Sequence, residues 1–213
     1  MLALQTEFGG QGMCGAFEQH GIAMHRWMAV LADRSNHKLN GINIRPTNMA
    51  ATFDAEGYSL RKWSLIPRWS KDPKLKFATF NARAETLTEK PSFRDAWRRS
   101  QRCVIPASAY FEWPVQDGKK HCHRIERQDS DAILFGGLWE TWRQADVTLN
   151  TFTIITTAAA SDIAWLHSRT PLLLDPEQVD PWLSSSPEEA EQMLRPRNVS
   201  GLAASIVASP TDV

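Results

Sequence analysis

Short hydrophobic runs separated by turn-forming residues dominate the middle of this chain of 213 residues. The runs are rich in β-branched and aromatic residues and are bounded by Pro, Gly, Asp or Asn, a pattern typical of β-strands. We predict strands over residues 61–66, 102–106, 109–113, 121–126, 132–140 and 151–157. The sequence Gln-Asp-Gly-Lys at 116–119 predicts a hairpin turn, because Asp-Gly readily adopts the positive φ values that such turns need.

Helical patterns flank this strand-rich region. Hydrophobic residues recur at three- and four-residue steps between residues 17 and 31, which predicts an amphipathic helix there. Two later segments, 175–178 and 186–189, place a capping side chain before a proline and a Glu or Gln three residues after the cap, which predicts helix starts. This order of elements favours an α+β fold with a mostly antiparallel, strongly curved sheet.

Composition narrows the class of protein. No repeat and no linker rich in Pro, Gly or Ser divides the chain, so we predict one domain. No run approaches about eighteen apolar residues, and residues 1–12 lack the features of a signal peptide, so no membrane partner is expected. Three cysteines argue against a disulfide framework and for a reducing compartment, and we therefore expect a cytoplasmic protein.

The 24 basic and 24 acidic residues cancel, which is a poor profile for a protein that coats DNA without specificity. The charge is unevenly distributed, however. Residues 61–102 contain 12 Lys and Arg against 4 Asp and Glu, whereas residues 175–191 are acidic. This basic block is either a solvated face or a groove for a polyanion, and charge alone leaves both interpretations open.

Polar side chains occur in unusual places in two predicted strands. In an extended segment Asn81, Arg83 and Glu85 would all face one side, because they alternate with alanines. Glu112 lies beside Trp113 in an otherwise apolar strand, where a carboxylate is costly to bury unless it is paired or its pKa is raised. Both groups also have a structural interpretation, as a solvated strand face and as a salt-bridge partner.

A third polar stretch, His167-Ser-Arg169, follows an apolar helical segment, so it is either a capped helix end or part of a site. The order of the three stretches along the chain resembles that of the SRAP family, the SOS response-associated peptidase domains. Met13-Cys-Gly comes first, followed by NARAE, RCVIPASAYFEW and LHSRTP. The stretches INIRPTN, RKWSLIPRW, FGGLWETW and TFTIITTAA resemble family segments as well, and the similarity runs from about Met13 to about Trp182. Each motif alone is weakly specific, but their joint order identifies the chain as a member of this family.

The resemblance implies a single α+β domain over residues 13–213, in which a bent sheet forms a small barrel-like core flanked by helices. It also implies binding of single-stranded DNA and covalent crosslinking to abasic sites, which protects them during the DNA damage response. In the family, removal of methionine exposes an N-terminal cysteine, here Cys14, whose amine and thiol capture the abasic aldehyde as a thiazolidine. The implied partner is single-stranded DNA containing abasic sites, with nucleoid association when bound, and neither a cofactor nor a metal is expected.

An N-terminal cysteine has the reactivity that this role needs. An α-amine has an unperturbed pKa of about 7.7–8.0, well below about 10.4 for lysine, so more of it is nucleophilic at neutral pH. The amine condenses with the aldehyde to an imine, and the neighbouring thiol then adds to that imine. A five-membered ring results, which a lysine Schiff base cannot form.

The matching motifs imply roles for three further residues in the chemistry. Glu112 would assist opening of the sugar ring and proton transfer to the departing hydroxyl, for which a pKa raised by burial is suitable. His167 would shuttle protons for ring opening and for reversal of the linkage. Asn81 would hold the cysteine end and the linkage through hydrogen bonds.

The resemblance also implies contacts to DNA. Arg83 would bind a phosphate flanking the lesion, and Trp113 with one of Trp63 or Trp69 would stack on neighbouring bases. The complete set of implied DNA contacts is Arg83, Trp113, Trp63, Trp69, Arg169, Asn43 and Pro46.

Two residues depart from the family pattern. Ala16 stands where most members have an arginine that contacts DNA phosphate, so DNA affinity is either lower or maintained by another basic residue. Thr170 stands where methionine is common.

The larger departure is the segment 1–12, because an internal Cys14 has no α-amine. Three explanations are open. In the first, Met13 is the true start and the preceding residues are a mis-assigned gene start or a cloning artefact. In the second, these residues are a propeptide that is removed with Cys14 as internal nucleophile. In the third, the extension is permanent. We favour the first explanation, then the second.

Other functions remain open. Cys14 and His167 could serve as the thiolate and base of a cysteine peptidase, or the basic block and the tryptophans could form a noncovalent module for single-stranded DNA. The stretch His-Cys-His at 121–123 is a poor metal site, because Cys122 points to the other strand face and no second cluster completes four ligands. Cys103 is expected to be a small core residue, and nothing demands more than a monomer.

Overall fold

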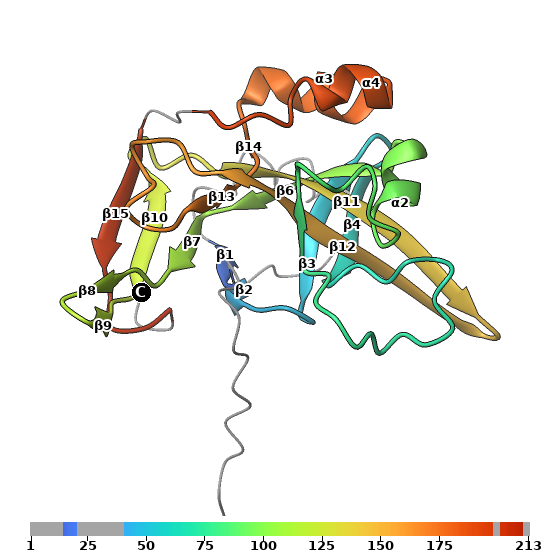
Figure 1. The fold of residues 1–213 in the computed structure, drawn as a ribbon, viewed down its shortest axis with the longest axis horizontal. Coiled ribbons are helices and arrows are strands. Elements are labelled where there is room, and N and C mark those ends of the chain that lie inside the picture. Colours follow the sequence, from blue (N-terminus) through green and yellow to red (C-terminus); the bar gives the residue numbers. More distant parts are fainter. Residues whose placement is uncertain (1–14, 21–40, 198–200, 211–213) are drawn as a thin grey trace, which may run out of the picture.

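Strands dominate the fold (Figure 1), which we describe from a computed structural model over residues 15–20, 41–197 and 201–210. The main sheet contains β3 (Met49–Asp54), β4 (Gly57–Trp63), β5 (Asn81–Arg83), β6 (Arg102–Ala107), β11 (Ile133–Gln144), β12 (Val147–Ala158), β13 (Arg169–Pro171) and β14 (Leu173–Leu174). The second sheet contains β1 (Phe17–Gln19), β2 (Gly41–Ile44), β7 (Ala109–Glu112), β10 (His123–Arg127) and β15 (Leu202–Ile206). A separate hairpin consists of β8 (Val115–Gln116) and β9 (Lys119–Lys120).

Part of the main sheet closes into a ring of hydrogen-bonded pairs. β12 pairs with β4, β4 with β3, β3 with β6 and β6 with β11, and β11 returns to β12. β12 runs parallel to β4 and to β5, whereas every other described pair is antiparallel. The prediction of mostly antiparallel pairing is therefore confirmed. The prediction of one bent sheet is only partly right, because the strands divide between this ring and a second sheet.

The middle of the chain follows the predicted strands. β6, β7, β10, β11 and β12 each cover most of a predicted run. The predicted hairpin turn joins β8 to β9, with Asp117 and Gly118 at φ values of 50° and 74°. β4 begins earlier than predicted because its first half pairs with β3, and it ends at Trp63, where the following Ser64 has a φ of 119°.

The helix predicted over residues 17–31 is wrong at its start. Phe17–Gln19 forms β1, which pairs with β2 on one side and β7 on the other, while residues 21–31 lie outside the described residues. All three side chains of β1 are buried. Gln19 makes the strand conformation favourable, because its amide donates to the carbonyls of Ala51 and Pro106 and accepts from the Ala51 N–H. An amphipathic surface helix would leave this amide without those partners.

Helices are few and short in the described part of the chain. α2 (Arg94–Arg98), α3 (Val179–Ser184) and α4 (Pro187–Glu191) are each shorter than two turns, so the fold is mostly β rather than balanced α+β. Both predicted helix starts are confirmed, as capping boxes before α4 and before the short 3₁₀ helix η2 (Pro176–Gln178). None of these helices has the length and apolar character needed to cross a membrane.

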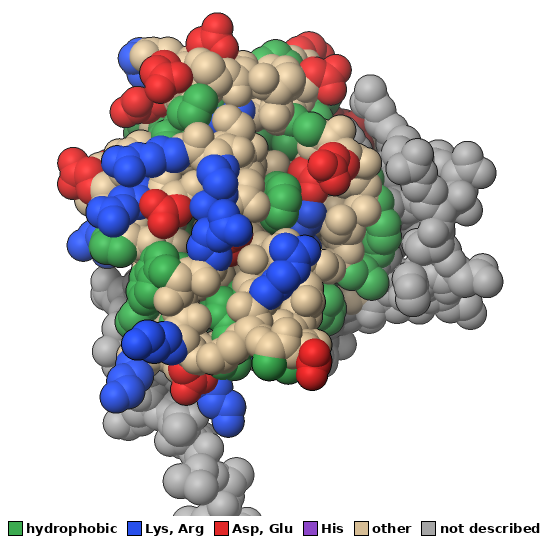
Figure 2. Space-filling view, turned by 90° about the vertical axis from the view of Figure 1, so that its right-hand side faces the viewer, with side chains coloured by type: hydrophobic (Ala, Val, Ile, Leu, Met, Phe, Trp, Pro, Cys, Tyr) green, Lys and Arg blue, Asp and Glu red, His purple; other side chains and the backbone are tan. Residues whose placement is uncertain are grey.

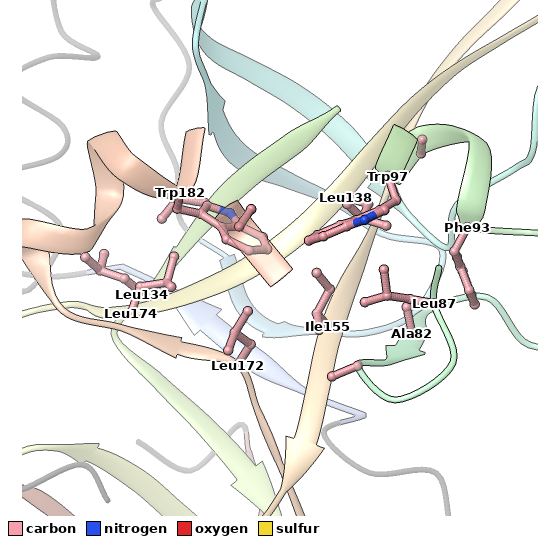
Figure 3. Close-up of a cluster of buried hydrophobic side chains, with 14 of the residues drawn as sticks. Ala82, Leu87, Phe93, Trp97, Leu134, Leu138, Ile155, Leu172, Leu174 and Trp182 are labelled. Carbon is pink, nitrogen blue, oxygen red and sulfur yellow. The ribbon is translucent and has the colours of Figure 1, made fainter. Parts of the chain in front are cut away.

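Two buried clusters hold the elements together. The first joins the two sheets, since Phe17 of β1 and Tyr110 of β7 pack with Trp63 and Phe135 of the main sheet. The second cluster, drawn in Figure 3, fixes α2 and α3 on the main sheet through Trp97 and Trp182, whose ring centroids are 6.1 Å apart. The helices therefore lie away from β1 and β2 (Figure 1). β1 is the strand that follows Cys14, the first of the predicted site residues.

Candidate functional site

The segment that follows Cys14 is fixed by β7. Phe17 lies opposite Tyr110, and the Phe111 N–H donates to the Ala16 carbonyl at 3.0 Å. Continuing this register places Gly15 opposite Glu112, the last residue of β7. Cys14 itself lies outside the described residues, one peptide bond before Gly15.

Glu112 is buried in the middle of the second sheet, with 4% of its surface exposed. On the side away from β1 it lies opposite His123 of β10. The His123 ring contacts the Trp165 ring edge-to-face, with centroids 5.3 Å apart. Trp165 precedes His167 by two residues, so the loop that carries His167 is anchored beside the strand that carries Glu112.

A second polar group assembles around Thr156 near the end of β12. Arg83 of β5 lies opposite Thr156, and the Arg169 Nη2 donates to the Thr156 carbonyl at 2.6 Å. Arg169 also donates twice to Glu85, at 3.0 and 2.9 Å. The structure thus brings together the NARAE and HSRTP stretches, which lie more than eighty residues apart in the sequence.

His167 is held in this group through its backbone neighbour. Its Nδ1 accepts a hydrogen bond from the Arg169 N–H at 3.1 Å, which leaves Nε2 as the protonated nitrogen of a neutral ring. Burial lowers the pKa of His167 below its usual value; the hydrogen bond with the Arg169 backbone works against this, and the Arg169 cation adds a smaller lowering. In this tautomer the neutral imidazole donates a hydrogen bond from Nε2.

Arg169 was predicted to contact DNA, but its guanidinium already forms an ion pair with Glu85. The bidentate bond from Arg169 lowers the pKa of the Glu85 carboxyl, which stays ionised. Arg83, in contrast, is exposed and lies at the same level of β12. Of the two arginines, Arg83 has the guanidinium more open to a ligand.

The aromatic contacts connect the two polar groups. The Phe17 and Trp63 rings are 5.0 Å apart, and the Trp63 and Phe80 rings are 6.0 Å apart. The Trp63 indole N–H donates to the Phe80 carbonyl at 2.7 Å, directly before Asn81. This buried chain fixes Asn81 relative to the segment that follows Cys14.

The structure corrects one predicted DNA contact. Trp63 has no exposed surface, so it is a core residue and cannot stack on a base. Trp69 is 49% exposed, and its indole N–H donates to the Pro91 carbonyl at 3.0 Å. Sequence alone could not choose between Trp63 and Trp69, because the register that buries one of them depends on pairing with β12.

Trp113 is covered by a residue that the sequence analysis did not single out. The guanidinium carbon of Arg45 lies 5.1 Å from the centroid of the Trp113 ring. Arg45 Nε donates to the Asn43 side-chain oxygen at 2.6 Å, and Pro46 follows in the same turn. The sequence does point to Arg45 indirectly, because it lies between the predicted contacts Asn43 and Pro46 in the INIRPTN stretch.

The basic block of residues 61–102 divides between the interior and the surface. Arg61 is buried and paired with Asp54, Arg102 is buried against the carbonyls of Trp182 and Ser185, and Arg99 pairs with Glu140. Besides Arg99, the exposed cations of the block are Arg68, Lys71, Lys74, Lys76, Arg83, Lys90, Arg94 and Arg98. Figure 2 shows basic side chains gathered on one face with a few acidic ones among them. The charge excess is therefore partly structural.

The remaining cysteines lie in packed surroundings. Cys103 is fully buried in the first core cluster, as predicted, and burial raises its pKa to about 12. Cys122 is buried against Ala16 and Phe111, and burial raises the pKa of its thiol too. Within the described ranges, no group of three or more His, Cys, Asp or Glu side chains is placed to hold a metal ion.

Comparison with known proteins gives consistent matches. A model of the SOS response associated peptidase (SRAP) family matches residues 13–210. The chain is 37% identical over 176 residues to the abasic site processing protein YoqW of Bacillus subtilis, and the match covers 78% of each chain. It is 35% identical over 168 residues to the abasic site processing protein YMR114C of Saccharomyces cerevisiae, which covers 72% of this chain and 44% of the yeast protein.

Solved structures share the fold. A protein from Bordetella bronchiseptica superposes with a TM-score of 0.81 at 25% identity, covering 92% of this chain and 100% of that one. A protein from Bacteroides thetaiotaomicron gives a TM-score of 0.77 at 24% identity, covering 93% and 97%. The family match spans both polar groups described above, from the segment around Cys14 to Arg169. This chain therefore belongs to the SRAP family, the SOS response associated peptidases.

Proposed function

We propose that this protein processes abasic sites in single-stranded DNA by forming a covalent thiazolidine between Cys14 and the ring-opened sugar. The observation that carries the proposal is the register of β1 on β7, which brings the residue after Cys14 level with a buried carboxylate, Glu112. Similar proteins named for abasic site processing support the substrate class. The proposal requires that Cys14 is the N-terminal residue of the acting form.

The proposed chemistry conserves atoms and charge. The Cys14 amine attacks the aldehyde carbon, and the resulting carbinolamine loses water to give an imine. The Cys14 sulfur then adds to the imine carbon, and the thiol proton ends on the nitrogen. The sum is aldehyde plus aminothiol giving thiazolidine plus water, so no oxidant, reductant or cofactor is consumed.

The described residues supply proton transfer and positioning in this scheme. Glu112, buried in β7, protonates the departing hydroxyl as the sugar ring opens. His167, neutral because its pKa is lowered, relays protons between the opening sugar and solvent. Asn81, fixed by the Trp63–Phe80 contact, hydrogen-bonds the cysteine end.

DNA binding in this scheme uses fewer residues than the resemblance implied. Arg83 contacts a phosphate, and Trp113 and Trp69 stack on bases beside the lesion. Asn43 and Pro46 shape the turn that faces Trp113. Arg169 acts through its ion pair with Glu85, which fixes the His167 loop.

Incubation with oligonucleotides tests the proposal. Protein beginning at Cys14 is compared with the chain of 213 residues and with a Cys14→Ala variant, using abasic and intact single strands. We expect a heat-stable adduct only for the form beginning at Cys14 and only with abasic DNA. An adduct of undiminished yield with Cys14→Ala would overturn the proposal.

The same samples separate the alternatives for the segment 1–12. Intact mass of the long form, followed over time, detects loss of residues 1–13 if Cys14 acts as an internal nucleophile. A noncovalent binding module would instead retain salt-sensitive binding in all three forms and give no adduct in any of them. A native protein whose N-terminus stays at Met1 would contradict the crosslinking function.

A further inference from the structure

Arg45 is held rigidly in the turn between β2 and β3. Its backbone N–H donates to the Asn48 side-chain oxygen at 2.8 Å, and its Nε donates to Asn43 at 2.6 Å. Asn43 adopts a left-handed backbone conformation, with φ of 57°, and in this conformation its side-chain oxygen accepts the bond from Arg45 Nε. Asn and Asp are the side chains that most readily accept this conformation. The guanidinium is therefore fixed in place before any ligand arrives.

This guanidinium lies beside the proposed reacting end. Arg45 Nη1 is 3.5 Å from the carbonyl oxygen of Gly15, the residue bonded to Cys14. On its other side the guanidinium stacks over Trp113, at 5.1 Å from the ring centroid. Trp113 is the proposed stacking surface, so Arg45 lies between the covalent site and a base platform.

The positive charge of Arg45 has no carboxylate partner among the described residues. Three other buried or partly buried arginines pair with acids, Arg61 with Asp54, Arg124 with Glu18 and Arg169 with Glu85. Arg102 instead donates to the carbonyls of Trp182 and Ser185. The ionisable group that faces Arg45 is the Cys122 thiol, whose raised pKa keeps it neutral at neutral pH. Burial in turn lowers the pKa of Arg45, which is the cost of partly desolvating an unpaired cation.

The guanidinium also retains hydrogen-bond donors for a ligand. It carries five N–H donors, of which the Nε donor is used by Asn43 and one Nη1 donor makes a long bond to Gly15. The Nη2 donors make no hydrogen bond to another described residue. Planar arginine forks of this kind match phosphate oxygens.

Position 16 cannot supply this charge. Ala16 is fully buried against Phe111 and Cys122, so its side chain points into the packed face of β1. Arg45, from the turn after β2, is the cation whose side chain contacts Gly15 among the described residues.

We propose that Arg45 binds the backbone phosphate adjacent to the captured abasic sugar and so positions the lesion at Cys14. This inference rests on the proposed function, because it assigns Arg45 to the same DNA substrate. Arg45 is a positioning residue in this scheme: it takes no part in bond making, and it holds the strand where Trp113 stacks on the neighbouring base.

Salt dependence of binding tests this inference independently of the covalent step. Binding of an abasic single strand is measured in the Cys14→Ala background, with and without Arg45→Met, which keeps an apolar cover on Trp113 but removes the charge. Each phosphate contact contributes about 0.7 to the slope of log affinity against log salt for single strands. We expect Arg45→Met to reduce that slope by about 0.7 and to weaken binding about five- to tenfold at low salt.

Matched variants define the outcome. Arg45→Lys should keep most of the slope while losing part of the affinity, because the charge remains but the planar fork does not. Arg195→Met removes an exposed arginine that follows α4 and bonds Gln192, and it should leave both unchanged. Slopes for Arg45→Met and Arg195→Met that both equal the parent slope would overturn the inference.

Capture kinetics distinguish failure of this inference from failure of the proposed function. With protein beginning at Cys14, Arg45→Met should slow capture of an abasic oligonucleotide but not of 2-deoxyribose, which has no phosphate. Equal slowing of both substrates would mean that Arg45 acts on the cysteine end and would contradict a phosphate contact. If the parent protein forms no adduct while its slope still depends on Arg45, the covalent function fails and the phosphate contact stands.

Discussion

The side chain of His167 combines partial burial, a neighbouring cation and a fixed tautomer. Its pKa is lowered mainly by burial, with a smaller lowering by the Arg169 cation and an opposing contribution from the Arg169 backbone hydrogen bond, so proton binding is weaker in the folded chain than in the unfolded one. The resulting stability is present above the unfolded pKa of about 6.5 and is lost as the pH falls toward the folded value. We expect the imidazole signal of His167, assigned by its absence in His167→Gln, to titrate below pH 6.5 in NMR spectra.

The Arg169 contribution to this shift can be measured separately. Arg169→Met removes the nearby cation and should raise the His167 midpoint toward the usual value, although burial keeps part of the shift. A midpoint that moves further down in Arg169→Met would contradict the electrostatic interpretation.

The three cysteines should differ sharply in reactivity. Cys103 is fully buried with a pKa raised to about 12, and Cys122 is buried with a raised pKa, so neither presents a thiolate near pH 8. We expect iodoacetamide to label only Cys14 in the native protein and all three residues after denaturation, as read from peptide masses. Rapid native labelling of Cys122 would show that the β10 face opens more readily than its packing indicates.

The sequence identifies the chemically distinctive residues, but it does not predict the contacts that these residues make in the fold. Glu112 and His167 stand out because a carboxylate in an apolar strand and an imidazole before a Ser-Arg pair are unusual. The Glu85–Arg169 ion pair and the Arg45–Trp113 contact depend on segments joined only by the fold, and no local pattern predicts them. The choice between Trp63 and Trp69 as a stacking residue stays open in the sequence for the same reason, because a tryptophan looks the same in the sequence whether it is buried or exposed.

Strand β11 contains a glycine where a side chain does not fit. A Cβ on Gly137 would lie 2.5 Å from the Thr153 carbonyl oxygen of β12, and backbone cannot move away as a side chain can. We expect Gly137→Ala to destabilise the protein by about 1–3 kcal/mol in urea unfolding, with little change in the denaturant slope.

Gly136 is the matched comparison within the same strand. Its added Cβ would meet the side-chain end of Leu172 at 2.7 Å, which can rotate away. Gly136→Ala should therefore cost less than Gly137→Ala. An equal or larger loss for Gly136→Ala would show that the Leu172 side chain is as constrained as the β11–β12 backbone.

Strands are predictable from the sequence where the local residue pattern favours a strand and the pairing partner is the next strand along the chain. The long hairpin of β11 and β12 has β-branched and aromatic runs and pairs with its sequence neighbour, so local pattern suffices. β1 was misassigned because Phe17 also fits a helical spacing with later hydrophobic residues, whereas its strand state depends on β7, about ninety residues away. β5 and β13 were missed as strands because each is three residues long and is defined by β12.

The buried cluster around α2 and α3 lies apart from the proposed reactive site around Gly15 and Glu112. Trp182 is fully buried, and its indole N–H donates to the Cys103 carbonyl at 3.0 Å, so it ties α3 to β6. We expect Trp182→Ala to lower the free energy of unfolding by about 3–5 kcal/mol while leaving the rate of abasic-site capture unchanged at temperatures where the variant is folded.

Trp69→Ala should show the opposite behaviour. Trp69 is half exposed, so its removal should change the free energy of unfolding by less than about 1 kcal/mol but weaken binding of single-stranded DNA. Differential scanning calorimetry and binding measurements on the two variants check both expectations. Loss of binding in Trp182→Ala with an unchanged melting temperature would contradict this division.

The closed ring of β12, β4, β3, β6 and β11 is complete only after β12 has been translated, because its strands come from distant parts of the chain. The segment around Gly15 leaves the ribosome first, but β7, β12 and β13 are translated much later, and the edge strand β15 is made near the end. Under the proposed function, a nascent chain that begins at Cys14 therefore carries its amine and thiol before Glu112 and His167 have been translated. Under the proposed function, proton transfer assisted by Glu112 and His167 is thus restricted to chains that extend past β13, whereas the intrinsic reactivity of an N-terminal aminothiol is present from the start.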